Sequence, residues 1–222
     1  MQRITQALGV QCTYCHVQPS VQLLSAEEAA AAENQGQGRG RGRGQGPPPM
    51  NFAADDKPQK KAAREMLRLV DDINRRLTTR LGKPAPAVVR VECVTCHRGV
   101  TEPQQLSELL SRTMLTKGDG AAVATYRDLR QRYYGAQAYD FRERLLLALG
   151  EESLAANKPD DAVAWLQLNV EFYPKSAPSF VALARAHLRL RDSGAAIRDL
   201  ERALEADPGH AEAKRQLAAL QR

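Results

Sequence analysis

The sequence of 222 residues has few aromatic side chains, four histidines and only four cysteines. Aromatic residues make up 5% of it, and its 32 lysines and arginines are mixed with 26 acidic residues. Proteins that bind nucleic acid concentrate basic charge in a patch and often add aromatic side chains for stacking, so we expect no such partner. No apolar run approaches the roughly 20 residues of a membrane span. We therefore expect no transmembrane segment in this chain.

All the cysteines fall in two copies of Cys-x-x-Cys-His, within VQCTYCHVQ and VECVTCHRG. The residues of these motifs are Cys12, Cys15, His16, Cys93, Cys96 and His97. Disulfides or a zinc site built on four cysteines would leave both histidines without a role, and a thioredoxin-type motif needs a strand that the sequence does not predict. In a c-type site, two thiols bond to the porphyrin and the adjacent histidine binds iron. The motifs therefore predict two haem c groups with His16 and His97 as axial ligands.

The other axial position of each iron distinguishes an electron carrier from a site that handles oxygen or peroxide. The remaining candidates are Met1, Met50, Met66, Met114, His187 and His210. A helix predicted between Pro58 and Gly82 carries an apolar stripe made of Ala63, Met66, Val70, Ile73 and Leu77. A shorter stripe of Met1, Ile4 and Leu8 ends at Gly9. Because core packing is the usual role of a methionine on such a stripe, the residues alone leave the sixth ligand open.

Three segments, in this order, resemble one dihaem half of the multihaem cytochrome subunit of photosynthetic reaction centres: ALGVQCTYCHV, FAADDKPQKKAAREMLRLVDDIN and VECVTCHRG. The resemblance covers about residues 1–103. In that family a helix before each haem motif supplies a methionine to the iron. The resemblance therefore implies Met1 as a ligand of the first haem and Met66 as a ligand of the second. Some members carry a later histidine that binds another haem, and its absence from INRRLTTRLG favours a dihaem unit.

Two irons with histidine and methionine ligands have no open coordination site, which favours an electron carrier over an enzyme. Arg98 directly follows the second motif and is either a hydrogen-bond partner of a haem propionate or an ordinary solvated arginine. The enzymatic alternative is a dihaem peroxidase, which needs an open iron with polar groups near it. A further alternative is a partner-binding protein in which the haems are structural.

A low-complexity insertion at about residues 21–50 departs from the family pattern. Its segment NQGQGRGRGRGQGPPP lacks large apolar side chains, so it predicts a flexible surface loop. Another copy of the chain is one candidate for a partner of this loop. This leads to the hypothesis that the subunits join into a filament in which the haems form a continuous conductor.

The second half of the chain shows a 34-residue period, seen most clearly between Pro174 and Pro208. The same offset pairs Leu149 with Leu183, Gly150 with Ala184, Ala162 with Ala196 and Leu166 with Leu200. This is the tetratricopeptide (TPR) period, so we predict repeats at 143–176 and 177–210 and a capping helix over 211–221. We expect His187 to pack between the helices of its repeat and His210 to face solvent.

The predicted fold class is all-α, with a small dihaem cytochrome c domain over residues 1–103 that has few strands and long loops. A helical connector over 104–142 leads to the TPR-like repeats of 143–222, which we expect to serve docking to redox partner proteins or self-assembly. Covalent haem attachment implies maturation outside the cytoplasm. We therefore expect a periplasmic, cell-surface or extracellular protein whose signal peptide preceded the numbered start.

Overall fold

The computed structural model describes residues 2–16, 57–81 and 90–221, and within these ranges it contains helices and no strand. The chain divides into two compact units, unit 1 over Met1–Thr101 and unit 2 over Glu102–Arg222. The predicted all-α fold class is confirmed. Met1, Met50 and the insertion at about 21–50 lie outside the described residues.

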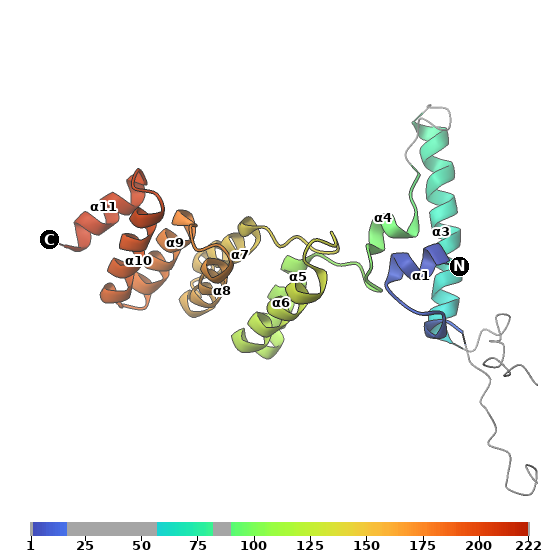
Figure 1. Cartoon of the computed structure of the whole chain (residues 1–222), viewed down its shortest axis with the longest axis horizontal. Helices are drawn as coiled ribbons and strands as arrows, with labels where there is room; N and C mark the ends of the chain where they lie inside the picture. The colour runs from blue at the N-terminus through green and yellow to red at the C-terminus, as the bar shows by residue number, and fades with distance from the viewer. Residues whose placement is uncertain (1, 17–56, 82–89, 222) are drawn as a thin grey trace, which may run out of the picture. The chain divides into compact units, whose positions relative to one another are not determined.

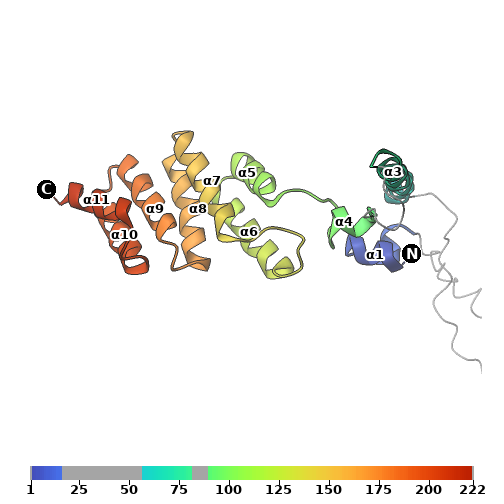
Figure 2. The same ribbon diagram turned by 90° about the horizontal axis from the view of Figure 1, so that it is seen from above.

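The described residues of unit 1 form four helical segments of different lengths. These are α1 (Gln2–Leu8), the 3-10 turn η1 (Cys12–Tyr14), α3 (Pro58–Arg80) and α4 (Cys93–His97). Helices α1 and α4 pack against each other, and the long α3 runs beside them as a separate rod (Figures 1 and 2). Pro58 opens α3 as expected, because its ring suits the first helical turn. The helix ends at Arg80 with Leu81 as C-cap, one residue before Gly82, which lies outside the described residues.

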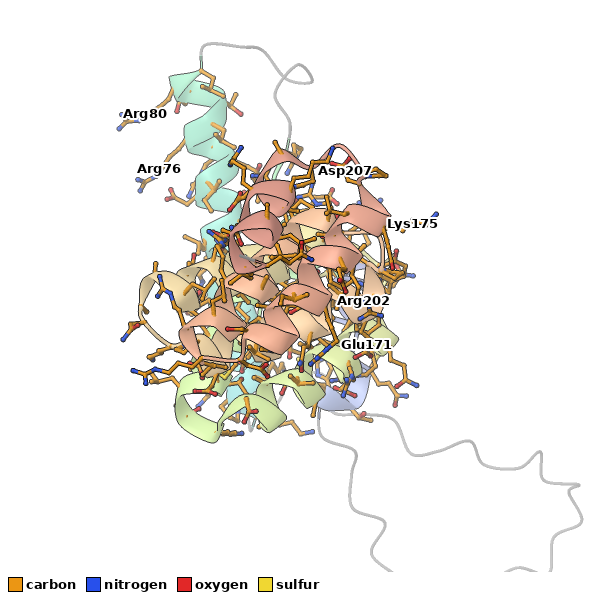
Figure 3. The ribbon with its side chains drawn as sticks, turned by 90° about the vertical axis from the view of Figure 1, so that its left-hand side faces the viewer. Arg76, Arg80, Glu171, Lys175, Arg202 and Asp207 are labelled. Atoms are coloured by element: carbon orange, nitrogen blue, oxygen red, sulfur yellow. The ribbon has the colours of Figure 1, made fainter. Side chains whose placement is uncertain are left out.

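Helix α3 has one charged side and one side with little cover. Arg76 pairs with Asp72 one turn earlier, with 2.7 Å between Nε and Oδ2. Arg76 and Arg80 both project away from the helix (Figure 3). Lys60 is the only buried residue of α3, and even Leu67 and Leu69 are nearly half exposed. Of the predicted apolar stripe, Met66 is exposed and the other four residues are partly buried, so no member of it is fully buried among the described residues.

The described residues of unit 1 bury very little. The buried ones are Ala7, His16, Lys60 and Val100, of which only two are apolar. A unit of this size normally needs a disulfide, a metal or another bound group when its own core is so small. The described part of unit 1 thus has the burial pattern of a domain that is completed by a further component.

Unit 2 is a stack of helices connected by short turns. Its members are α5 (Leu106–Lys117), α6 (Asp119–Tyr133), α7 (Glu143–Ala155), α8 (Pro159–Phe172), α9 (Ala177–Arg189), α10 (Ser193–Ala206) and α11 (Ala211–Leu220). They follow one another along the unit (Figure 1), and the turns after α8 and α10 contain Lys175 and Asp207 (Figure 3). Helices α7 and α9 start 34 residues apart, as do α8 and α10. The predicted TPR-like repeats are confirmed.

Close packing between the helices of a repeat depends on small residues. A Cβ atom built on Gly150 would lie 2.6 Å from Cγ of Leu166, too close for any real contact. In the next repeat the equivalent position is Ala184, which is fully buried. The small residues that revealed the period therefore mark where paired helices approach each other.

The segment predicted as a helical connector, 104–142, forms α5 and α6 within unit 2. Its Leu110 and Tyr126 belong to one buried cluster with Leu146 and Trp165 of the first repeat. This cluster supplies the helical cover that a stack of only two repeats requires. None of the helices in the described ranges has the length and apolar content needed to cross a membrane.

The two histidines of unit 2 have structural roles. His187 is largely buried and its Nδ1 lies 2.7 Å from Oδ2 of Asp199, so it packs inside its repeat as expected. Burial raises the pKa of the Asp199 carboxyl. Our expectation that His210 faces solvent is wrong, since it is half-buried and its Nδ1 accepts a hydrogen bond from the backbone N–H of Ala213 at 3.4 Å. The first N–H groups of α11 lack partners within the helix, and the imidazole satisfies one of them.

Candidate haem sites

The second Cys-x-x-Cys-His motif forms the single-turn helix α4. Residues three and four positions apart share one face of a helix, so Cys93, Cys96 and His97 are directed to the same side. Glu92 and Thr95 cap the start of this turn reciprocally through their side chains. The geometry that places two thiols and an imidazole on one side is therefore a local property of the motif.

A hydrogen bond orients the ring of His97. Its Nδ1 lies 2.9 Å from the carbonyl oxygen of Val100, which can only accept a hydrogen bond. The Nδ1 atom must therefore carry the proton, which leaves the lone pair of Nε2 for a metal ion. This is the tautomer that an axial haem ligand requires.

The first motif forms a tighter turn. Cys12 accepts backbone hydrogen bonds from Cys15 at 3.3 Å and from His16 at 3.0 Å. His16 is only 3% exposed, whereas Cys12 is exposed and Cys15 is partly exposed. In this turn, both thiols are therefore accessible from outside, whereas the imidazole of His16 is buried.

The first cavity has a volume of about 290 Å³ and is lined by Cys12, Cys15 and His16 of the first motif. It lies between the motif, α1 and α3, and its lining residues are Ile4, Thr5, Leu8, Val10, Gln11, Cys12, Cys15, His16, Lys60, Ala63, Arg64 and Leu67. Most of these side chains are apolar, and two are cationic. An apolar cavity with cations among its walls suits a flat hydrophobic macrocycle with negatively charged propionates.

The second cavity is larger, at about 800 Å³, and opens onto the start of α4. It is lined by Arg3, Gln6, Ala7, Leu67, Val70, Asp71, Asn74, Arg90, Val91, Glu92, Cys93 and Val94. Of the second motif, Cys93 is among these residues, while Cys96 and His97 are not. This cavity is more polar than the first because two arginines and two acidic residues lie around it.

Leu67 lines both cavities, so the two spaces share a wall on α3. Helix α1 also contributes to both, with Ile4 and Leu8 in the first and Gln6 and Ala7 in the second. Although α1 precedes the first motif in the sequence, it packs against α4 of the second. The two motifs are therefore parts of one structural unit.

The predicted ligands and charge partners have different positions in the structure. Met66 is 42% exposed and neighbours Leu67, but neither cavity includes it among its lining residues. Arg98 adopts a left-handed backbone conformation with φ of 48° at the end of α4, and it is exposed. Neither cavity is lined by Arg98. The ligand roles of Met66 and Met1 stay predictions.

Sequence reasoning missed the cationic residues that do line the cavities. They are Lys60 and Arg64 in the first cavity and Arg3 and Arg90 in the second. The spacing of Lys60, Arg64 and Leu67 was a usable signal, because positions three or four apart share a helix face. No local pattern indicated Arg3 or Arg90, which reach the second cavity from segments far apart in the sequence.

The four thiols and two imidazoles of unit 1 fit haem attachment better than they fit disulfides or a zinc site. All four thiols are free in the structure, and the described residues contain no group of three or more metal-binding side chains that could hold an ion. The first motif lines one cavity with both thiols and its imidazole, and the second motif reaches the other cavity through Cys93. The side chains of Met66, Leu67 and Leu69 on α3 are exposed. Two flat apolar groups, bonded through the thiols, would supply the burial that the unit lacks.

A close contact between two glycines joins the two motifs. The backbone N–H of Gly99 donates to the carbonyl oxygen of Ala7 at 2.8 Å. Gly9 has a φ of 65°, and a Cβ atom built on it would lie 2.3 Å from the carbonyl oxygen of Gly99. Only glycine combines this backbone conformation with such a close approach.

We expect the substitution Gly9→Ala to lower the free energy of unfolding of unit 1 by at least about 2 kcal/mol, from backbone strain and overpacking together. The Soret absorbance of the holoprotein during thermal unfolding would report it. Gly99→Ala is the matched control, because Gly99 also has a positive φ of 92° but has no atom within 4 Å of a built Cβ. If both variants lose the same free energy of unfolding, the close approach of Gly9 to Gly99 contributes nothing to stability.

Comparisons with known proteins agree with this site. Residues 44–149 match the family model described as "Photosynthetic reaction centre cytochrome C subunit". The chain resembles a reaction-centre cytochrome. Residues 177–220 match a tetratricopeptide repeat model. Cytochrome c-554 of Chloroflexus aurantiacus is 35% identical over 96 residues, which are 43% of this chain. Those residues cover only 15% of that relative's length.

The resemblance inferred from the sequence is thereby confirmed, together with the TPR segment that follows it. Likeness to cytochromes c implies covalently bound haem c. The matched range contains the second motif and continues through α5 and α6 into α7. It begins after the first motif, so the assignment of the first haem depends on Cys12, Cys15 and His16 themselves.

Proposed function

We propose that this protein is an extracytoplasmic electron carrier with two haem c groups, one on Cys12 and Cys15 and one on Cys93 and Cys96. The main support is that the first motif lines one cavity with both thiols and its imidazole, that Cys93 of the second motif lines another, and that Leu67 is common to both cavities. When bound, the haems would supply one-electron redox chemistry. The likeness to cytochromes supports an electron carrier over an enzyme.

The residues of unit 1 would bind the groups and keep water away from them. The thiols would anchor each macrocycle, and the imidazoles of His16 and His97 would bind iron from one side. The carbonyl of Val100 would hold His97 in its ligand tautomer. On the other side we propose Met1 and Met66, which would close both irons to small molecules. Lys60, Arg64, Arg3 and Arg90 would stabilise the propionates.

The proposal is tested by the spectra and reactivity of the purified holoprotein. We expect low-spin spectra in both oxidation states, a near-infrared methionine band in the oxidised form, and two one-electron steps in a redox titration. We also expect no binding of carbon monoxide and no peroxide turnover, since a closed iron offers no site. A high-spin fraction with peroxide turnover would contradict the proposal and favour a dihaem peroxidase.

For unit 2 we propose docking of a redox partner protein or of another copy of the chain. Its support is the likeness to tetratricopeptide repeats, which stack helix pairs into extended binding surfaces. Self-assembly through this unit and the inserted loop would join haems of successive subunits into a filament. Sedimentation at high concentration distinguishes the two, because a single monomeric species would contradict self-assembly and leave partner docking.

A further inference from the structure

The side chain of Asn74 pairs with the main chain of Val91 through two hydrogen bonds. Its Nδ2 donates to the carbonyl oxygen of Val91 at 2.8 Å, and its Oδ1 accepts from the N–H of Val91 at 2.8 Å. Both bonds are partly buried and join residues 17 positions apart. Asparagine suits this pairing because its amide presents a donor and an acceptor side by side, as a backbone residue does.

This pair joins α3 to the segment that leads into the second motif. Val91 lies two residues before Cys93, and both line the second cavity together with Asn74. At the other end of α3, Nζ of Lys57 donates to the carbonyl oxygen of Thr13 in the first motif. Lys57 and Asn74 are separated by about 25 Å of helix. Each motif thus has its own hydrogen-bonded attachment to α3.

The attachment matters because α3 buries few of its residues completely. Its sole fully buried residue is Lys60, near its start. Around Asn74, the apolar Val70, Ile73 and Leu77 are only partly buried. The two hydrogen bonds of Asn74 therefore add a directed constraint to the partial packing that holds this half of the helix. Met66 lies eight residues before Asn74 on the same rigid helix, so whatever fixes Asn74 also fixes Met66.

We propose that Asn74 is a positioning residue for the second haem site. Its amide holds α3 at a set distance from Cys93 and so places Met66 relative to the iron bound by His97. This inference rests on the proposed function, because it assumes a haem between α3 and α4. It goes further by assigning the geometry of that site to a residue that is neither an iron ligand nor a covalent anchor of the porphyrin.

The test compares two substitutions in the full-length holoprotein. Asn74→Leu keeps the size of the side chain and removes both hydrogen bonds, whereas Asn74→Gln keeps both functional groups one methylene further out. The control is Thr79→Val, since the Thr79 hydroxyl is exposed and, among the described residues, donates only to carbonyls of its own helix, on Arg75 and Arg76. Three quantities are measured for each: amide exchange at Val91, the two haem potentials, and the near-infrared methionine band.

We expect Asn74→Leu to speed amide exchange at Val91 at least tenfold, to lower the potential of the second haem, and to weaken its methionine band. The first haem should keep its potential. Asn74→Gln should recover part of each effect, and Thr79→Val should change none. Faster exchange at Val91 with both potentials unchanged would overturn the proposal, because Asn74 would then only tether the loop. If amide exchange at Val91 in Asn74→Leu is unchanged, the proposal is overturned as well, because the two hydrogen bonds then do not hold this segment.

Failure of the proposed function gives a different result. If the unmutated protein carries haem but shows no methionine band, the ligand role of Met66 is wrong. Asn74 is then judged by the potentials alone, and a selective shift of the second potential in Asn74→Leu would still support its positioning role. Equal shifts of both potentials would contradict it, because a general loosening of unit 1 affects both sites.

Discussion

Replacing Cys93 and Cys96 together by alanine is expected to yield a protein that carries one haem in place of two. Both covalent bonds to the second porphyrin are lost, and His97 alone gives no covalent anchor. Intact-mass spectrometry should show a decrease of one haem mass beyond the change from the substitutions. The paired control, Cys12→Ala with Cys15→Ala, should also leave one haem, attached at the other motif.

The same substitutions should disrupt the folding of unit 1 while unit 2 stays folded. Unit 1 buries only Ala7 and Val100 as apolar residues within its described ranges, whereas unit 2 has two extensive clusters built from α5 to α11. Removing one bound group from a unit with so little core removes much of its buried apolar surface. Limited proteolysis should therefore cleave unit 1 and spare residues 102–222. An unmutated protein that contains zinc and no haem would refute the whole assignment.

Met66→Ala is expected to have the second largest effect. Loss of the thioether ligand should open the second iron, add a high-spin component to the spectrum and remove half of the near-infrared methionine band. The potential of that haem should fall by part of the roughly 0.8 V over which axial ligands set haem potentials. Redox titration of the purified variant would resolve this shift from the unchanged first haem.

Leu69→Ala is the matched control for Met66→Ala. Leu69 is 49% exposed and Met66 is 42% exposed, and they lie one turn apart on α3. Each substitution thus removes a similar exposed side chain from the same helix. If the two variants show the same spectra and potentials, Met66 is not an iron ligand. Met66 would then be an exposed residue of α3 with no direct role at the haem.

The helices could largely be predicted from the sequence. The 34-residue period and the small residues Gly150 and Ala184 predicted the helix pairs of unit 2, because close helix packing requires small side chains at fixed intervals. Pro58 marked the start of α3. The shared face of the second motif was also predictable, since the spacing of Cys93, Cys96 and His97 places them on one side of a helical turn.

The walls of the cavities could not be predicted in the same way. Of the apolar stripe that we expected on α3, Ala63 lines the first cavity and Val70 the second, but Met66 lines neither. The residue that lines both cavities, Leu67, is not in the stripe. Successive side chains of a helix point in directions about 100° apart. A predicted apolar stripe therefore does not determine whether one of its residues or the next residue in the sequence faces a cavity. Which neighbour faces a cavity depends on where the helix is held, and that is set by distant contacts such as the one between Asn74 and Val91.

The sequence by itself determined the chemistry of this protein: two Cys-x-x-Cys-His motifs, an all-α fold and a TPR-like second unit. These are local or periodic properties, which adjacent residues carry without reference to the rest of the chain. Only the tertiary structure decided that α1 packs on the second motif, that Gly9 meets Gly99, and that Leu67 separates two cavities. These relations join residues remote in the sequence, and no pattern along the chain records which of them meet.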